Sequence, residues 1–284
     1  MNGSPLVWIT GATGLIGSEL VRSAPRIAPN FLARGLSRAD VDLLDTETLS
    51  RLFRNEKPHA IIHCAAMAQS GQCDANPDAA NRINVELTRF LAELAAEIPF
   101  IFFSTDLVFD GEKGNYVEED AARPLSVYGT TKAKAEDEVR RHTQHLILRL
   151  SLTGGHSSSG NRGFNEEIKN AWSSGKALNL FVDEHRCPSS SDVISRAVWE
   201  LFLKGARGTF HLCGSERLSR YEIGQSLATK HPELNPRINA TSRKDYKGPP
   251  RPRDTSMNCA KAQRLLSFEI PRFSAWLAQD CTGF

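Results

Sequence analysis

The sequence predicts an α/β protein, a doubly wound parallel sheet with a smaller interleaved substrate-binding subdomain. Through the first half of the chain, short apolar runs alternate with segments of helical periodicity, which is the pattern of buried strands joined by crossover helices. The first apolar run leads directly into a glycine-rich turn. At 284 residues the chain is long enough for one such sheet and one smaller unit.

The elements of the first half follow from the length and continuity of the apolar runs. A helix begins near Leu15, and the apolar residues Leu87, Leu91, Leu94 and Ile98 recur at helical spacing. The remaining runs are short and continuous, as expected for strands that are covered on both faces. We predict these strands over residues 6–10, 60–65, 100–105 and 146–150.

The second half of the chain has a different pattern of predicted elements. A loop rich in glycine and serine covers residues 154–163, and a Pro-rich loop covers residues 247–254. Helices are predicted over 191–203, 221–230 and 260–266, and a strand over 209–213 could rejoin the main sheet. We therefore expect residues 1–150 to form a dinucleotide-binding domain, rejoined by about 187–213, and residues 151–284 to form mainly the substrate-binding subdomain.

Composition excludes several classes of function. The 35 basic and 33 acidic residues give a net charge of only +2, so we expect no nucleic-acid partner. The apolar runs are too short to cross a membrane, and the N-terminus lacks the pattern of a signal peptide. A cytoplasmic protein with six reduced cysteines and no metal site is expected, because no C-x-x-C pair occurs. The oligomeric state is left open, a homodimer being one option.

The first chemical motif is the glycine-rich turn between the first strand and the first helix. Its spacing is G-x-x-G-x-x-G, and its position is that of the fingerprint of a Rossmann dinucleotide-binding unit. Glycines let the backbone approach a pyrophosphate, whose charge is then met by the helix N-terminus. The residues expected to bind the cofactor here are Gly11, Thr13, Gly14, Leu15, Ile16 and Gly17.

The segment after the second strand predicts the choice of cofactor. An acidic residue there would bind the 2′-hydroxyl of NAD, but no carboxylate occurs before Asp40. Arg38 could pair with a 2′-phosphate and Ser37 could donate to it. We therefore favour NADP(H), with NAD(H) as the alternative, and place Asp42 and Leu43 beside the adenine ring.

The third motif is Tyr128-x-x-x-Lys132 at the start of a predicted helix. Residues at i and i+4 share one helix face, so the Lys132 ammonium, together with an oxidised nicotinamide, is expected to lower the pKa of the Tyr128 phenol, which is normally near 10. Upstream, Ser104 and Thr105 end a buried strand, at the sheet edge where ligands bind in open α/β folds. Thr105, Tyr128 and Lys132 thus form a predicted catalytic set.

The run from Ser104 to Lys132 resembles the signature of the dTDP-4-dehydrorhamnose reductases, which are extended short-chain dehydrogenase/reductases. It is also similar to a relative of that family, the regulatory beta subunit of methionine adenosyltransferase. The residues that carry the resemblance are Ser104-Thr105-Asp106-Leu107-Val108-Phe109-Asp110-Gly111, Tyr116, Glu118-Glu119-Asp120 and Pro124-Leu125-Ser126-Val127-Tyr128-Gly129 with Lys132. Further matches are His63-Cys64-Ala65-Ala66, Cys73-Asp74-Ala75-Asn76-Pro77 with Asn84, and Arg251-Pro252-Arg253-Asp254.

The resemblance implies a role for each matching residue. Tyr128 would donate a proton to the substrate carbonyl oxygen as hydride arrives from the nicotinamide, Lys132 would hold the nicotinamide ribose, and Thr105 would hydrogen-bond the substrate oxygen. Further cofactor contacts are implied for Cys64, Ala65, Ala66, Ser104 and Leu150, and substrate contacts for Met67, Asp106 and Arg251.

The same comparison separates reduction from related reactions. Dehydratases of similar sequence carry a glutamate directly after Thr-Asp, whereas this chain has Leu107, which cannot abstract a proton. The chain also lacks the aromatic residue that such reductases usually carry after the strand with Arg149. Two functions therefore remain: a reductase of a nucleotide-linked 4-keto-6-deoxy sugar, or a non-catalytic NADP-binding regulatory subunit.

Overall fold

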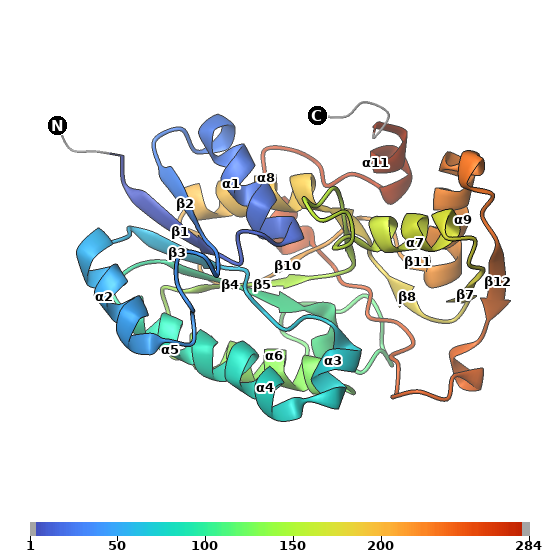
Figure 1. Cartoon of the computed structure of the whole chain (residues 1–284), viewed down its shortest axis with the longest axis horizontal. Coiled ribbons are helices and arrows are strands. Elements are labelled where there is room, and N and C mark those ends of the chain that lie inside the picture. Colours follow the sequence, from blue (N-terminus) through green and yellow to red (C-terminus); the bar gives the residue numbers. More distant parts are fainter. Residues whose placement is uncertain (1–3, 280–284) are drawn as a thin grey trace.

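The computed structural model describes residues 4–279, and its centre is a six-stranded parallel sheet (Figure 1). The strands lie in the order β10-β5-β4-β3-β1-β2. This arrangement confirms the predicted doubly wound α/β fold. The bounds of the strands are β1 Leu6–Thr10, β2 Leu32–Leu36, β3 Ala60–His63, β4 Phe100–Thr105, β5 Leu146–Leu150 and β10 Gly208–Leu212.

Helices cover both faces of this sheet. Figure 1 shows α1 (Leu15–Ile27) and α8 (Ser191–Leu203) on one side of the sheet. On the other side lie α2 (Thr46–Glu56), α5 (Leu87–Leu94) and α6 (Val127–Arg140). Each face therefore buries its own apolar layer, which explains why the central strands are apolar without interruption.

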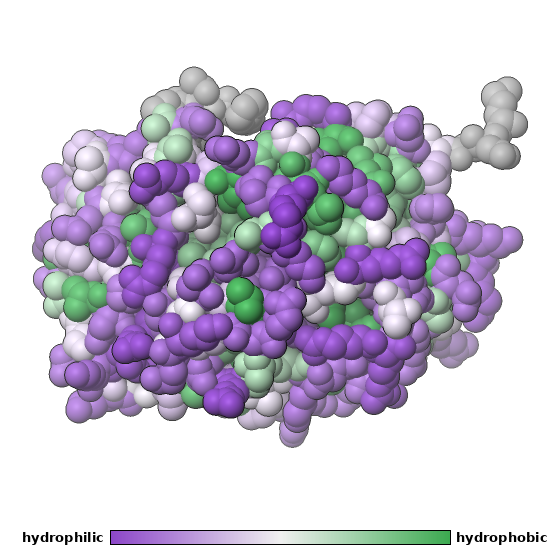
Figure 2. Space-filling model, turned by 180° about the vertical axis from the view of Figure 1, so that it is seen from behind, coloured by the Kyte–Doolittle hydropathy of each residue, from purple (hydrophilic) through white to green (hydrophobic). Residues whose placement is uncertain are grey.

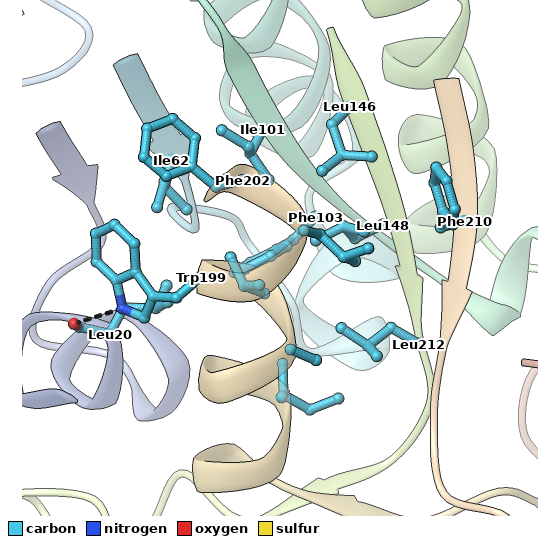
Figure 3. Packing of buried hydrophobic residues seen from close by; sticks show 14 of the residues in the cluster. Leu20, Ile62, Ile101, Phe103, Leu146, Leu148, Trp199, Phe202, Phe210 and Leu212 are labelled. Atoms are coloured by element: carbon cyan, nitrogen blue, oxygen red, sulfur yellow. Dashed lines mark hydrogen bonds between the residues drawn. The ribbon is translucent and has the colours of Figure 1, made fainter. Parts of the chain in front are cut away.

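The strand residues alternate between these two layers. Val7 and Ile9 pack on the α1 and α8 side, whereas Trp8 between them packs on the opposite side. On the first side the Trp199 indole donates a hydrogen bond to the Leu20 carbonyl oxygen at 3.2 Å (Figure 3). This bond satisfies a fully buried polar group and ties α8 to α1.

The second half of the chain builds a smaller cluster beside the carboxyl ends of the strands. Its hydrophobic core includes Phe164, Trp172, Ile223 and Trp276. The elements are the helices α7 Phe164–Ser173, α9 Arg220–Lys230 and α11 Phe273–Gln279, with the strand pairs β6 Thr153–Gly154 with β9 Ser189–Ser190, β7 Leu178–Phe181 with β12 Ile238–Thr241, and β8 His185–Arg186 with β11 Leu218–Ser219. Strand β10 returns to the main sheet and pairs with β5.

Some predicted boundaries were wrong. The strand expected over 60–65 ends at His63, and the helix expected over 260–266 is the single turn α10, Ala260–Gln263. The helix expected to run to Ile98 ends at Leu94 and is preceded by a π-helical turn, Arg82–Glu86, which follows α3 (Ser70–Ala75) and α4 (Pro77–Asn81).

The outer surface is mainly polar. Figure 2 shows the side of the molecule that is hidden in Figure 1, where hydrophilic residues predominate and hydrophobic ones form separate patches. Within residues 4–279 there is no helix that is both long and apolar enough to span a bilayer.

Candidate functional site

The glycine-rich turn between β1 and α1 is held in a shape that only glycine allows. Gly11 has φ of +65°, and a Cβ added there would lie 2.8 Å from the Ala65 amide nitrogen. A Cβ on Gly17 would lie 2.3 Å from the Gly11 carbonyl oxygen. The turn, the first helical turn and the loop after β3 therefore meet at backbone distance.

This turn presents the N-terminus of α1. Gly14 is the N-cap, and no acidic residue lies in the first turn of the helix. The first-turn amides, including those of Leu15 and Ile16, have no acceptor within the helix itself. The residues present therefore fit an anionic pyrophosphate, which a helix N-terminus stabilises.

A series of buried hydrogen bonds supports the glycine-rich turn from the ends of β1 and β3. The Ala65 amide donates to Thr10 Oγ1 at 3.3 Å, and Thr10 Oγ1 lies 2.7 Å from His63 Nδ1. On the other side of the ring, His63 Nε2 lies 3.2 Å from Thr88 Oγ1, which itself donates to the Asn84 carbonyl oxygen. This direction of donation assigns the proton to Nε2 of a neutral His63.

Burial keeps three histidines neutral, and acid should therefore destabilise the fold. Burial lowers the pKa of His63 and His211 to about 3 and that of His145 to about 4, from 6.5. Below pH 6.5 the unfolded chain binds protons that the native state excludes. Stability is thus retained above pH 6.5 and lost below it, by up to about 1.4 kcal/mol per pH unit for each histidine.

Urea unfolding at about pH 7 and about pH 5.5 measures this loss. His145→Gln should reduce the dependence of the unfolding free energy on pH by about a third, since one of the three buried histidines is removed. Equal unfolding free energies at the two pH values would contradict the assignment.

The segment after β2 carries the residues predicted to select the cofactor. Arg38 is exposed. The Asp40 carboxylate accepts hydrogen bonds from the Ser37 amide at 2.8 Å and the Ser37 hydroxyl at 2.6 Å, which lower the pKa of Asp40. The Ser37 hydroxyl, which was predicted to donate to a 2′-phosphate, thus donates to Asp40. Arg38, in contrast, is exposed at the surface. Asp42 is exposed and Leu43 is half-buried.

The sheet places the remaining predicted cofactor residues on one edge. Thr10 pairs in register with His63, and Thr105 pairs with Leu150. Because all these strands are parallel, their carboxyl ends open to the same side. The residues that directly follow β3, namely Cys64, Ala65, Ala66 and Met67, lie at this edge and are half-buried.

Tyr128 lies in the first turn of α6. The Ser126 side chain caps the helix by accepting from the Gly129 amide at 3.1 Å. A Cβ at Gly129 would lie 2.2 Å from the Leu107 carbonyl oxygen, so this glycine lets the helix approach the turn after β4. Thr105 lies close enough to Tyr128 to lower the pKa of its phenol, while Thr105 Oγ1 itself donates to Asp106 Oδ1 at 3.2 Å. The structure therefore brings the predicted Thr105 and Tyr128 hydroxyls together.

Lys132 by itself does not lower the pKa of Tyr128. Burial, and then the nearby Asp106 carboxylate, raise the pKa of Tyr128 well above 10, although Thr105 opposes the shift. The physical reason is that desolvation of a phenolate outweighs the neighbouring donors. Tyr128 is thus held as a protonated phenol at neutral pH.

Lys132 is buried one turn further along α6, with 2% of its surface exposed. Its Nζ lies 4.0 Å from the centroid of the Phe102 ring. Burial lowers its pKa to about 7, an effect opposed by Glu136, Cys64 and Cys73. Lys132 is therefore poised to gain or lose a proton near neutrality.

Asp106 does not face open space, contrary to its expected contact with substrate. Its carboxylate is fully buried and forms a bidentate ion pair with Arg186, through Nε and Nη2 at 2.5 Å each. Ser151 and Thr255 donate to the same carboxylate at 2.7 and 3.1 Å. Asp106 thus ties β4 to the second half of the chain, directly beside Thr105.

Ser104 also has a different partner from the one expected. Its hydroxyl donates at 2.5 Å to Glu136 Oε1, a buried carboxylate that is paired with Arg149. The Ser104 side chain thus contacts Glu136 on α6, whereas Thr105 Oγ1 accepts from the Leu107 amide and donates to Asp106 Oδ1, both at 3.2 Å. A cofactor contact through the Ser104 side chain is therefore not supported.

The predicted substrate residues Met67 and Arg251 are each held by a buried polar side chain. The Met67 backbone is clamped by the fully buried Asn84 side chain, which also donates to Thr131 of α6. Arg251 pairs with the buried Glu184 at 2.5 Å and stacks near Phe181 and Tyr246.

Sequence reasoning missed three functional-site supports. Asn84 was a motif match without an assigned role, and its π-helical turn, often a sign of a functional site, has no sequence signal. Arg186 and Glu184 were not identified, because their partners lie far away in the sequence. Among residues 4–279, no group of three or more metal-binding side chains is placed to hold an ion.

Comparison with known proteins identifies the family of the chain. The family model described as the RmlD substrate binding domain matches residues 6–282. The chain is 29% identical over 273 residues to methionine adenosyltransferase 2 subunit beta of Rattus norvegicus, covering 91% of this chain and 82% of that protein. It is 30% identical over 280 residues to dTDP-4-dehydrorhamnose reductase of Sinorhizobium fredii, covering 93% of each.

Two solved structures share the fold. A dTDP-4-dehydrorhamnose reductase from Clostridium acetobutylicum superposes with a TM-score of 0.87 at 24% identity, covering 97% of each chain. One from Bacillus anthracis, in complex with NADP, superposes with a TM-score of 0.85 at 21% identity, covering 97% of this chain and 98% of the other.

Proposed function

Because the chain belongs to the RmlD substrate binding domain family, we propose that it is an NADPH-dependent reductase of the keto group of a nucleotide-linked 4-keto-6-deoxy sugar. The observation that carries the proposal is the placement of Thr105, Tyr128 and Lys132 at the carboxyl edge of the sheet. A protonated phenol beside an alcohol can donate a proton to a carbonyl oxygen.

The residues around the glycine-rich turn would hold the dinucleotide. Gly11, Gly14 and Gly17 leave the backbone open to the pyrophosphate, and the Leu15 and Ile16 amides would donate to it. When bound, NADPH supplies the hydride that such a reduction requires. NADP in the Bacillus anthracis relative supports this choice, and NAD(H) is the alternative.

Each of the three side chains has one task in the proposed reaction. Tyr128 donates its proton to the substrate oxygen, for which its raised pKa is suited. Thr105 donates a second hydrogen bond to that oxygen and aligns it. Lys132, buried one helical turn away, orients the nicotinamide ribose.

The substrate diphosphate would bind at a cluster of arginines. Arg186, Arg220 and Arg251 surround Glu184, and Arg186 also pairs with Asp106. Arg220 also lies near Glu167, so the three guanidinium groups face three carboxylates, with which a diphosphate would compete. The Arg251 side chain is 35% exposed, against 10% for Arg186, so Arg251 is the proposed substrate contact.

Turnover is the test of this proposal. Oxidation of NADPH by the purified chain, followed at constant enzyme across a panel of dTDP- and UDP-linked 4-keto sugars, should show saturable reduction of at least one. Absence of turnover across the panel, with NADPH binding intact, would contradict it.

Arg38→Ala is expected to weaken NADPH binding by about tenfold or more while leaving NADH binding nearly unchanged. The physical reason is the loss of a charge-assisted contact to the 2′-phosphate, worth about 1.5–3 kcal/mol. Dissociation constants for both dinucleotides, measured by nicotinamide fluorescence, test it. Arg54→Ala on α2 is a control for surface charge, and equal losses for the two dinucleotides would refute the assignment.

A second candidate is a non-catalytic NADP-binding regulatory subunit. It is favoured by the similarity to the methionine adenosyltransferase subunit over 91% of the chain and by the absence of an aromatic residue after Arg149. In that case the panel shows no turnover, and a partner protein co-purifies with the chain. Turnover and co-purification, measured on the same purified protein, therefore distinguish the two functions.

A further inference from the structure

Three cysteines from distant parts of the sequence meet beyond the proposed active site. Cys187 follows β8, Cys213 follows β10, and Cys259 precedes α10. Cys213 Sγ lies 2.9 Å from Cys259 Sγ, and the Cys213 and Cys187 thiols donate to the same Met257 carbonyl oxygen. All three are free thiols. The sequence predicted thiols without a role, because residues 46 apart give no spacing signal.

A pocket gives solvent access to this cluster. Its volume is about 450 Å³, and it is lined by all three thiols together with polar residues that include Asn115, Arg217, Asn258 and Gln263. Cys213 is fully buried and Cys187 nearly so, whereas Cys259 is half-buried. A small molecule in the pocket can therefore reach Cys259 more easily than the other two sulfurs.

The hydrogen bonds distinguish the two sulfurs in contact. Cys259 Sγ accepts from the Cys213 amide at 3.2 Å and donates to the Cys213 carbonyl oxygen at 3.6 Å. The Cys213 thiol donates to the Met257 carbonyl oxygen at 3.6 Å. Its hydrogen bonds to Cys187 and Cys259, with burial, raise the pKa of Cys213, so Cys213 is the protonated partner.

We propose that Cys259 and Cys213 are a redox-modification site, in which Cys259 attacks a low-molecular-weight disulfide admitted by the pocket and Cys213 resolves the product. In the first step the Cys259 thiolate bonds to one sulfur of R–S–S–R and expels one thiolate. In the second, Cys213 Sγ attacks Cys259 Sγ, its proton passing to the departing second thiolate. The two cysteines lose two electrons, and R–S–S–R becomes two thiols.

Closure of the bond requires little movement. A disulfide has an S–S distance of about 2.05 Å, so the two sulfurs must approach by less than about 1 Å. The bond would join the end of β10, an edge strand of the main sheet, to the start of α10. Ala262 of α10 packs in the hydrophobic core on one face of that sheet. The proposal is independent of the reductase activity, because none of its atoms belongs to the catalytic set.

Mass spectrometry of the natively folded, full-length chain tests the site. After incubation with oxidised glutathione, free thiols are blocked with N-ethylmaleimide and the protein is digested without reduction. The expected product is a peptide pair joined through Cys213 and Cys259, lighter by two hydrogen atoms than the two free peptides and released by dithiothreitol. In Cys213→Ser, glutathione should remain attached to Cys259.

Cys64→Ser is the matched control, since Cys64 is also half-buried but lies outside the pocket, and it should give the wild-type cross-link. Full maleimide labelling of Cys213 and Cys259 after oxidation would overturn the proposal. So would a cross-link between Cys187 and Cys213, or one that forms only when urea has unfolded the chain.

Discussion

Tyr128→Phe is expected to lower kcat for NADPH-dependent reduction by about 10²- to 10⁴-fold, the range that general acid catalysis contributes. The substitution removes only the phenolic oxygen, so the turn of α6 and the burial of Lys132 are retained. The dissociation constant for NADPH should therefore change little. Stopped-flow measurement of a single turnover, alongside fluorescence titration of NADPH, separates the chemical step from binding.

Tyr221→Phe on α9 is the control, because it removes a phenol that is not part of the predicted catalytic set, and it should leave kcat unchanged. A Tyr128→Phe variant with wild-type kcat would refute the role of proton donor. Because the pKa of Tyr128 is raised, ionisation of this phenol should lower wild-type kcat only in alkaline buffer.

Arg186→Met is expected to lower the unfolding free energy by about 3–5 kcal/mol, the usual cost of removing one partner from a buried ion pair. The reason is that Asp106 is fully buried, so its carboxylate would be left without a counter-charge. The remaining hydrogen bonds from Ser151 and Thr255 offset only part of this cost. Urea denaturation monitored by circular dichroism measures the difference.

Arg272→Met is the matched control, since the pair of Arg272 with Glu216 has a 73% exposed arginine side chain and should contribute less than about 1 kcal/mol. The double variant Asp106→Asn with Arg186→Met should recover part of the lost stability, because the buried charge is then gone. A loss in Arg186→Met no larger than in the control would show that the pair is not a structural support.

Much of the fold was accessible from local patterns. Strands β4 and β5 and helix α8 have the predicted bounds, because continuous apolar runs and helical periodicity follow directly from burial on both faces of a sheet. The elements that were not predicted, such as α7 and the β7–β12 pair, lie where the chain forms its smaller core. Phe164, Ile168 and Trp172 of α7 recur at helical spacing, so this helix was accessible from the sequence, whereas β7 and β12 are only four residues long.

The sequence by itself determined the glycine-rich turn and the Tyr128-x-x-x-Lys132 pair, since steric freedom at glycine and the repeat of a helix act over a few residues. Only the tertiary structure decided which way Ser104 points, the raised pKa of Tyr128, the pairing of Asp106 with Arg186, and the contact between Cys213 and Cys259. These depend on desolvation and on groups brought together from segments 32 to 80 residues apart. Distance along the chain does not encode such proximity, so no local pattern could have revealed it.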